Sequence, residues 1–341
     1  MATSANTTIY DVAAQAGVSA MTVSRVLNGS ARVADGTRER VEAAIESLGY
    51  VPNTLARGLR SATRTVALVI PDVSNPFFTE LVRGAEAVAW AHDYTLFLGN
   101  THGSPEQEAL YLQKFVGHGV DGLLIAPSGD RSEGALEDLQ GRGLPFVLVD
   151  TKVGGIRADT VSSDNAEGAR QLTEHLLNLG HTAVALVGGD PDRSTSQERQ
   201  QGYEETLRQR SISPRPDYYV STDFSRAAGF EATQQLMSLA APPTALFAAN
   251  NTLAVGAVEA LRDLNLRVPE DVALVCFEDL ELASTLYPFL TVLAQPARTF
   301  GEVGAQFLLE RVRDPALAPR KRELPLSLIV RQSCGSKLHH S

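Results

Sequence analysis

The hydrophobic positions near the N-terminus recur every three or four residues, which is the spacing of a short amphipathic helix. The first predicted helix begins after Thr8, which forms a capping-box-like pair with Asp11. Its apolar stripe consists of Val12, Ala13 and Ala16. A glycine follows the stripe and predicts the end of the helix.

A second amphipathic helix follows this glycine, and Ser19 is placed to cap it. Its inward face contains Val23, Val26 and Leu27. The positions left on its outward face are Ala20, Met21, Thr22, Ser24 and Arg25. Such a pair of helices has the layout that places one helix in the DNA major groove, although any two-helix hairpin shows a similar pattern.

A third helix is predicted from Asp35 or Thr37 to Leu48, and it closes a small three-helix core. Residues 53–60 form at most a helix of about two turns that contains a glycine, so we expect it to be unstable alone. The pattern therefore predicts an all-α head over residues 7–52, followed by a hinge helix and linker over residues 53–65.

From residue 66 onward, apolar runs alternate with helical patterns, as in βαβ units. The first set has strands at 66–70, 95–100, 121–127 and 145–150, with helices near 76–92, 105–118 and 132–142. The second set has strands near 160–163, 183–188, 218–221, 244–248 and 272–277, with helices near 165–179, 196–210, 226–239 and 251–264. The pattern predicts two α/β lobes with doubly wound parallel sheets and a cleft at the carboxyl ends of their strands.

Composition narrows the class of protein. No apolar run approaches the roughly 18 residues of a membrane span, and the N-terminal residues lack the basic and apolar parts of a signal peptide. We therefore expect a cytoplasmic protein with no membrane contact. Its two cysteines, Cys276 and Cys334, predict neither a disulfide framework nor a metal site.

The charge is distributed unevenly. The net charge is -10, yet residues 1–65 carry seven basic and five acidic side chains, whereas the rest of the chain carries 23 basic and 35 acidic ones. Attraction to phosphates depends on local charge, so the head is the part suited to DNA.

Long segments of the chain resemble the lactose-repressor (LacI/GalR) family of bacterial transcription regulators. The matching segments are DVAAQAGVSAMTVSRVLN at 11–28, TRERVEAAIESLGYVPNTLARGL at 37–59, IPDVSNPFF at 70–78, ANNTLAVG at 249–256 and RVPEDVALV at 267–275. The resemblance implies a helix-turn-helix head and a periplasmic-binding-protein-like body over residues 66–331 that binds an effector and dimerises. In that body, a helix near 298–312 would return to the first lobe and a strand near 323–330 to the second. Residues 332–341 are expected to be a flexible tail without the tetramerising helix of some relatives.

The outward face of the second helix is expected to contact operator DNA in a homodimer, because one head offers few contacts. Ala20 and Met21 are placed to touch base edges, and Arg25 can bind guanine. Side chains suited to phosphate contacts are those of Ser19, Thr22, Ser24, Asn28, Arg32 and Asn53. Thr8 and Ala56 complete the predicted DNA-binding set.

Leu59 is a separate case. A leucine in a short basic segment is ordinarily a packing residue, but in the family the matching leucine enters the minor groove at the operator centre. The resemblance therefore implies that Leu59 acts as a wedge that kinks the duplex.

Polar and aromatic side chains follow the predicted strands where the lobes should meet. The candidates for effector binding are Asp72, Phe77, Phe78, Ser128 and Asp150 in the first lobe, and Arg193, Thr195, Arg199, Phe224, Asn250 and Glu278 in the second. Carboxylates, an amide and arginines around aromatic rings suit a sugar, and a nucleoside fits as well.

Two points stay open: which acidic residue contacts the ligand, and whether the ligand releases DNA or promotes its binding. The family commonly has Asp at the position of Glu278, so either Glu278 or the following Asp279 contacts the ligand. The resemblance favours release of DNA on effector binding, although a corepressor would use the same residues.

Other classes of protein fit less well. An extracytoplasmic solute-binding protein shares the two-lobed body but has no DNA-binding head and requires a signal peptide. GHGVDG at 117–122 matches a phosphate-binding glycine pattern, but it lies between a helix and a strand in the reverse order. Five histidines before the C-terminal tail are scattered without metal-ligand spacing, namely His92, His102, His118, His175 and His181. We expect no cofactor, metal or catalytic activity.

Overall fold

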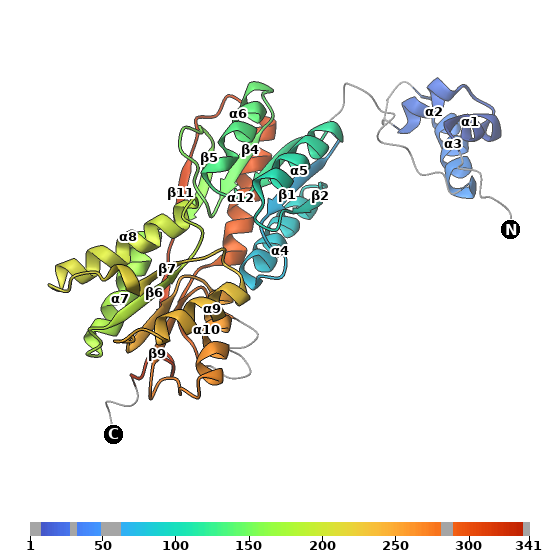
Figure 1. The fold of residues 1–341 in the computed structure, drawn as a ribbon. Helices are drawn as coiled ribbons and strands as arrows, with labels where there is room; N and C mark the ends of the chain where they lie inside the picture. The colour runs from blue at the N-terminus through green and yellow to red at the C-terminus, as the bar shows by residue number, and fades with distance from the viewer. Residues whose placement is uncertain (1–7, 28–32, 49–62, 281–288, 337–341) are drawn as a thin grey trace. The chain divides into compact units, whose positions relative to one another are not determined.

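The computed structural model describes residues 8–27, 33–48, 63–280 and 289–336 (Figure 1). The chain forms two compact units, residues 1–61 and residues 62–341. No helix of the described residues is long and apolar enough to cross a bilayer.

The N-terminal unit is a bundle of three helices, α1 (Ile9–Ala16), α2 (Ala20–Leu27) and α3 (Asp35–Leu48). The predicted capping box is present at α1, where Thr8 N donates to Asp11 Oδ2 at 2.7 Å. Each helix contributes to one core, in which Val12, Val23 and Val41 are fully buried. The helix boundaries and the three-helix core predicted from the sequence are therefore confirmed.

The first lobe of the C-terminal unit contains a parallel six-stranded sheet in the order β11-β5-β4-β3-β1-β2 (Figure 1). Its strands are β1 (Thr65–Ile70), β2 (Thr95–Asn100), β3 (Gly122–Ile125), β4 (Phe146–Val149), β5 (Asp159–Ser163) and β11 (Lys321–Leu324). Its helices are α4 (Pro76–Ala91), α5 (Pro105–Gly117), α6 (Glu133–Gly141) and α12 (Ala297–Arg313).

Helix α12 packs against α4 and the central strands of this sheet, so the predicted return of this helix to the first lobe is confirmed. Two glycines permit the close approach of the helices. A Cβ atom at Gly84 would lie 2.1 Å from the backbone oxygen of Arg298, and one at Gly301 would lie 1.9 Å from that of Leu81. Any larger residue at either position would push the helices apart.

The second lobe contains a six-stranded sheet in the order β12-β10-β9-β8-β6-β7. Its strands are β6 (Val184–Gly188), β7 (Tyr219–Ser221), β8 (Ala245–Ala248), β9 (Ala273–Phe277), β10 (Thr291–Ala294) and β12 (Ser327–Ile329). Its helices are α7 (Asn165–Asn178), α8 (Ser194–Gln209), α9 (Arg226–Met237) and α10 (Asn251–Asp263). Only β12, which is antiparallel to β10, breaks the parallel arrangement within the described sheet.

Two expectations about strands are corrected, and one strand was missed. The strand near 160–163, expected in the second lobe, is β5 of the first sheet. The single strand expected near 323–330 is two short strands, β11 in the first sheet and β12 in the second, separated by Pro325. Pro325 has no backbone N–H to donate to a neighbouring strand, so the chain leaves the first sheet there and enters the second. Strand β10 was not predicted.

The expected tail is also corrected in part. Ser333 and Cys334 are fully buried in the second lobe. Ser333 Oγ donates to the Leu274 oxygen at 2.6 Å and accepts from Thr291 N at 2.8 Å. Residues 332–336 therefore belong to the lobe, and residues 337–341 lie outside the described part of the chain.

Candidate nucleic-acid interface and ligand cavity

Helix α2 presents the side chains expected to face DNA. Met21 is 65% exposed and Arg25 is exposed, whereas Val23 and Val26 on the opposite face are buried. Ser19 caps the helix as predicted, because its Oγ accepts from Thr22 N at 3.2 Å. Ala20, Thr22 and Ser24 are partly exposed.

Several residues of the predicted interface cannot be placed. Those outside the described residues are Asn28, Arg32, Asn53, Ala56 and Leu59. One further exposed side chain of this unit was not among the predicted residues: Tyr10 on α1 is 74% exposed. Its position off the apolar stripe of α1 was the available signal.

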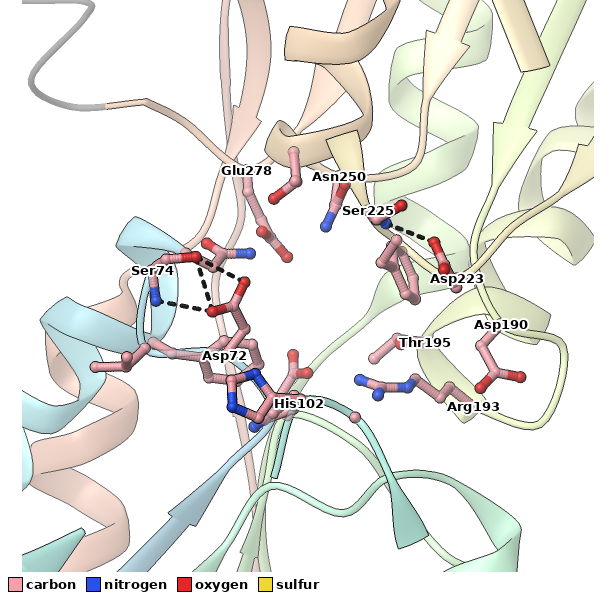
Figure 2. Close-up of a pocket in the computed structure, with 18 of the residues that line it drawn as sticks. Asp72, Ser74, His102, Asp190, Arg193, Thr195, Asp223, Ser225, Asn250 and Glu278 are labelled. Atoms are coloured by element: carbon pink, nitrogen blue, oxygen red, sulfur yellow. Dashed lines mark hydrogen bonds between the residues drawn. The ribbon is translucent and has the colours of Figure 1, made fainter. Parts of the chain in front are cut away.

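A cavity of about 640 Å³ lies between the two lobes of the C-terminal unit, and Figure 2 shows side chains from both lobes facing one another across it. The predicted residues that line it are Asp72, Phe78, Asp150, Arg193, Thr195, Arg199, Phe224, Asn250 and Glu278. Polar lining residues that the sequence analysis missed include Ser74, Asn75, Asn100, His102, Asp190, Asp223, Ser225, Arg226 and Thr252. Several of these also follow strand ends, in the loops after the edge strands β2 and β7.

Phe77 and Ser128 do not line this cavity. Successive helical side chains point about 100° apart, so Phe77 and Phe78 cannot both face the cleft. The Phe77 ring instead packs edge-on against Phe300 in the first-lobe core, with centroids 5.5 Å apart. Ser128 is fully buried, and its backbone N donates to Glu108 Oε2 at 2.6 Å.

Three contacts orient Arg199 in the second-lobe wall. Its Nε donates to Asn165 Oδ1 at 2.9 Å and its Nη1 donates to the Ala249 oxygen at 2.6 Å. The guanidinium carbon lies 3.7 Å from the centroid of the Phe277 ring. The remaining guanidinium nitrogen, Nη2, lies 3.5 Å from Glu278 Oε1.

Glu278 is a buried carboxylate with an incomplete set of partners. Its Oε1 accepts from Gln295 Nε2 at 3.3 Å, while Oε2 has no hydrogen-bond partner among the described residues. Burial raises the pKa of Glu278 to about 7, Arg199 opposes this shift, and the nearby Asp150 adds to it. A buried carboxylate oxygen without a partner can accept a hydrogen bond from a donor group of a bound ligand.

Asp279 occupies a different environment. Its Oδ1 and Oδ2 accept from Arg331 Nη1 and Nη2 at 2.8 and 2.6 Å. Asp279 does not line the interlobe cavity, whereas Glu278 does. Of the two alternatives left open by the sequence, the geometry therefore favours Glu278 as the residue facing a ligand.

Arg193 and Phe224 form the aromatic side of the cavity. The Arg193 guanidinium lies 5.8 Å from the centroid of the Phe224 ring, and burial lowers the pKa of Arg193. Arg193 Nε is buried without a hydrogen-bond partner in the described part of the chain. A Cβ atom at Gly189 would lie 1.9 Å from the Phe224 ring, so the ring position depends on this glycine.

The backbone around the cavity is strained. His102, Asp150, Phe224 and Glu278 all line the cavity and all have φ between 51° and 73°. Residues other than glycine rarely adopt this left-handed region, and such strain tends to gather at functional sites. The fold thus holds these side chains in orientations that local sequence alone would not select.

Direct contacts join the lobes around the cavity. Asn251 Nδ2 donates to Asn75 Oδ1 at 3.0 Å. At the rim, Arg131 Nε lies 3.0 Å from Asp192 Oδ2, and Lys152 Nζ lies 2.8 Å from Glu198 Oε1. Polar contacts therefore bridge the two lobes around the cavity. Within the described residues, no group of three His, Cys, Asp or Glu side chains could hold a metal ion.

Comparison with known proteins agrees with this geometry. The model of bacterial regulatory proteins of the lacI family matches residues 8–53, and that of the periplasmic binding protein-like domain matches residues 173–334. The HTH-type transcriptional repressor PurR of Aliivibrio fischeri (strain MJ11) is 35% identical over 335 residues, which are 97% of this chain and 99% of the relative. The chain belongs to the lacI family.

Solved structures of lacI-family and related regulators have the same architecture. The transcriptional regulator CelR in complex with cellobiose is 32% identical with a TM-score of 0.73, over 96% of this chain and 99% of that chain. The Lac repressor dimer bound to operator and the anti-inducer ONPF is 28% identical with a TM-score of 0.80, over 97% and 99%. The predicted family and fold class of this lacI-family regulator are confirmed.

Proposed function

We propose that this chain is a transcriptional repressor that binds double-stranded operator DNA as a homodimer and responds to a small effector in the interlobe cavity. The observation that carries the proposal is the combination, in one chain, of an exposed recognition helix with a cavity lined by incompletely paired polar groups. A related dimer binds an operator, and a related regulator binds cellobiose.

Arg25 tests the DNA-binding half of the proposal. Its exposed guanidinium on α2 can bind guanine through two hydrogen bonds, so Arg25→Ala should weaken specific operator binding by about 1–3 kcal/mol. The matched control is Arg40→Ala, which removes the same charge from an exposed position on α3. Gel shifts across genomic fragments measure both. Binding without sequence preference in the parent protein would contradict the proposal.

Leu59 tests the expected minor-groove wedge. Leu59→Ala should reduce discrimination at the central base step more than at the outer half-sites, because an apolar wedge acts by unstacking that step. Operator variants in a competition assay measure this difference. An unchanged preference would leave Leu59 with a packing role.

The effector is proposed to be a sugar or a nucleoside. Asp72, Asp150 and Glu278 supply hydroxyl acceptors, and Arg193 supplies a donor beside an aromatic ring face. The amide of Asn250, whose Oδ1 caps α10, also points its nitrogen into the cavity (Figure 2). A neutral ligand rich in hydroxyls matches this mixture better than an anion does, because the surrounding carboxylates repel negative charge.

A thermal-shift screen of sugars and nucleosides, repeated with operator DNA, tests this half. By linkage, a ligand that alters operator affinity must have its own affinity altered by operator by the same factor. Operator DNA lowers the affinity for an inducer and raises the affinity for a corepressor, so the direction of the change distinguishes the two. Arg199→Ala should abolish the ligand response and retain operator binding, whereas Arg215→Ala, at a surface ion pair, should change neither. Unchanged ligand affinity of Arg199→Ala in calorimetry would refute the site.

The remaining parts of the proposal follow from the family. Because lacI-family proteins are transcriptional regulators, we infer a protein that binds its ligand without turnover. We also infer a cytoplasmic location, since that is where a bacterial repressor meets its operator.

A further inference from the structure

Within the described residues, the chain passes between the lobes at three places, and two of them carry polar side chains that hydrogen-bond residues of the cavity wall, Arg199 and Glu278. Asn165 is the first residue of α7, directly after β5 has left the first sheet. Gln295 follows β10, where the chain leaves the second sheet toward α12. Side chains at such crossings change their surroundings when the lobes move relative to one another.

Hydrogen bonds and an ion pair connect Asn165 to both lobes. Lys152, in the first-lobe segment between β4 and β5, places Nζ 2.8 Å from Glu198 Oε1 on α8 of the second lobe. Glu198 Oε2 in turn accepts from Asn165 Nδ2 at 3.2 Å. Asn165 Oδ1 accepts from Arg199 Nε at 2.9 Å. The first lobe is thus joined to Arg199 through side chains alone.

Two features make this connection specific. Asn165 is only 1% exposed, and its amide uses its oxygen for Arg199 and its nitrogen for Glu198, so it cannot turn over without breaking both contacts. The Lys152 and Glu198 side chains are 38% and 25% exposed, so this ion pair can open in water at little cost. The connection therefore has a rigid end at the cavity and a releasable end at the rim.

We propose that Lys152, Glu198 and Asn165 form a relay of positioning residues that makes the orientation of Arg199 depend on whether the lobes are closed. This inference rests on the proposed effector control and names the residues through which it acts. A ligand that holds Arg199 in place stabilises the ion pair between Lys152 and Glu198 at the rim. Closure of the rim in turn fixes Arg199 before the ligand arrives. The other rim contact, between Arg131 and Asp192, does not include a residue that contacts Arg199 among the described hydrogen bonds.

The relay is testable in the full-length protein without any ligand. Spin labels at Gln107→Cys on α5 and Ala227→Cys on α9 report the separation of the lobes, because both positions are exposed at helix starts near the cleft. The native Cys276 and Cys334 are buried. Mixing with excess unlabelled protein restricts the measurement to labels within one chain.

Lys152→Met and Glu198→Gln should each reduce the population at the short distance by about two-fold or more, because each removes one side of the ion pair. The exchanged variant, Lys152→Glu with Glu198→Lys, rebuilds the ion pair but should not restore this population, because a lysine at position 198 cannot accept the hydrogen bond from Asn165 Nδ2. Asn165→Leu, which removes the hydrogen bonds of the amide to Arg199, Glu198 and the Ser163 oxygen, should shift the distances in the same direction. Glu204→Gln, on α8 but paired within that helix to Arg208, is the matched control and should leave the distances unchanged.

Parental distances in both Lys152→Met and Glu198→Gln would overturn the relay. A shift in those variants with parental distances in a folded Asn165→Leu would also overturn it, because the pair would then act without reaching Arg199. A change in melting temperature without a change in distances would mean a structural role only, which likewise refutes the relay. The ligand screen of the proposed function is independent, so either result can fail while the other stands.

Discussion

Asp159 in the first lobe and Glu278 in the second are both buried carboxylates next to arginines, but their partners differ. Asp159 accepts five hydrogen bonds, from the side chain of Arg311 and from the side chain and backbone N of Arg320, at 2.7–3.2 Å. Burial alone would raise the pKa of Asp159, yet these donors hold it below its ordinary value. Glu278 has two longer contacts, an oxygen without a partner in the described chain, and a pKa raised to about 7 by burial.

The difference separates a structural charge from one available for binding. A buried charge is tolerated when its hydrogen-bonding capacity is filled, and it is costly when that capacity is left open. The hydrogen-bonding capacity of Asp159 is filled, and its carboxylate connects β5, α12 and the segment before β11. Glu278 is open and faces the cavity, so a ligand can supply what the protein does not.

The largest expected effect tests the filled site. Asp159→Ala should lower the free energy of unfolding by about 3–5 kcal/mol, because it leaves two arginines without their buried partner. Because the folded pKa of Asp159 is depressed, its stabilising contribution is present above the ordinary pKa of 3.8 and is lost as pH falls through the folded value. Urea unfolding of the body at pH 7 and pH 3 measures this. The control is Asp138→Ala, at an exposed pair with Arg142, and equal losses in both variants would break the comparison.

A somewhat smaller effect of opposite sign is expected at the open site. The folded pKa of Glu278 is raised, so its charged form destabilises the fold, and stability falls as pH rises from about 4.5 to about 7. Glu278→Gln should match the parent near pH 4.5 and exceed its unfolding free energy by up to about 3 kcal/mol at pH 8. Parallel urea titrations across this range measure the difference. A parent curve that stays parallel to that of the variant would show that Glu278 is not penalised by burial.

The smallest effect compares the buried Arg193 with the partly buried Arg311. Arg193 Nε has no partner within the described structure, so Arg193→Met should leave stability within about 1 kcal/mol of the parent or raise it, while weakening ligand binding. Arg311→Met should instead destabilise clearly, because Arg311 binds both oxygens of Asp159. Thermal melts of the two variants side by side provide the measurement. Similar losses in both would mean that Arg193 has a structural role.

Much of the candidate site could be predicted because parallel sheets bring strand ends together. Asp72, Asp150 and Glu278 follow apolar strands, and the rule that ligands bind at carboxyl ends selected them. The same rule extends to His102 and Asp223, which follow the edge strands β2 and β7 and were missed. Phe77 shows the limit of the rule, since a helix begins at Pro76 and turns alternate side chains into the core.

The sequence by itself determined the local elements of this protein: the capped helices of the head, the alternation of strands and helices in the body, and the edge where a cavity forms. These features depend on periodic burial and on caps within a few residues, so they are encoded locally. Only the tertiary structure decided that β5 joins the first sheet, that β11 and β12 belong to different sheets, and that Asp279 pairs with Arg331 and leaves Glu278 to the cavity. Those outcomes depend on which distant segments meet, and the spacing of residues along one segment carries no record of its partner.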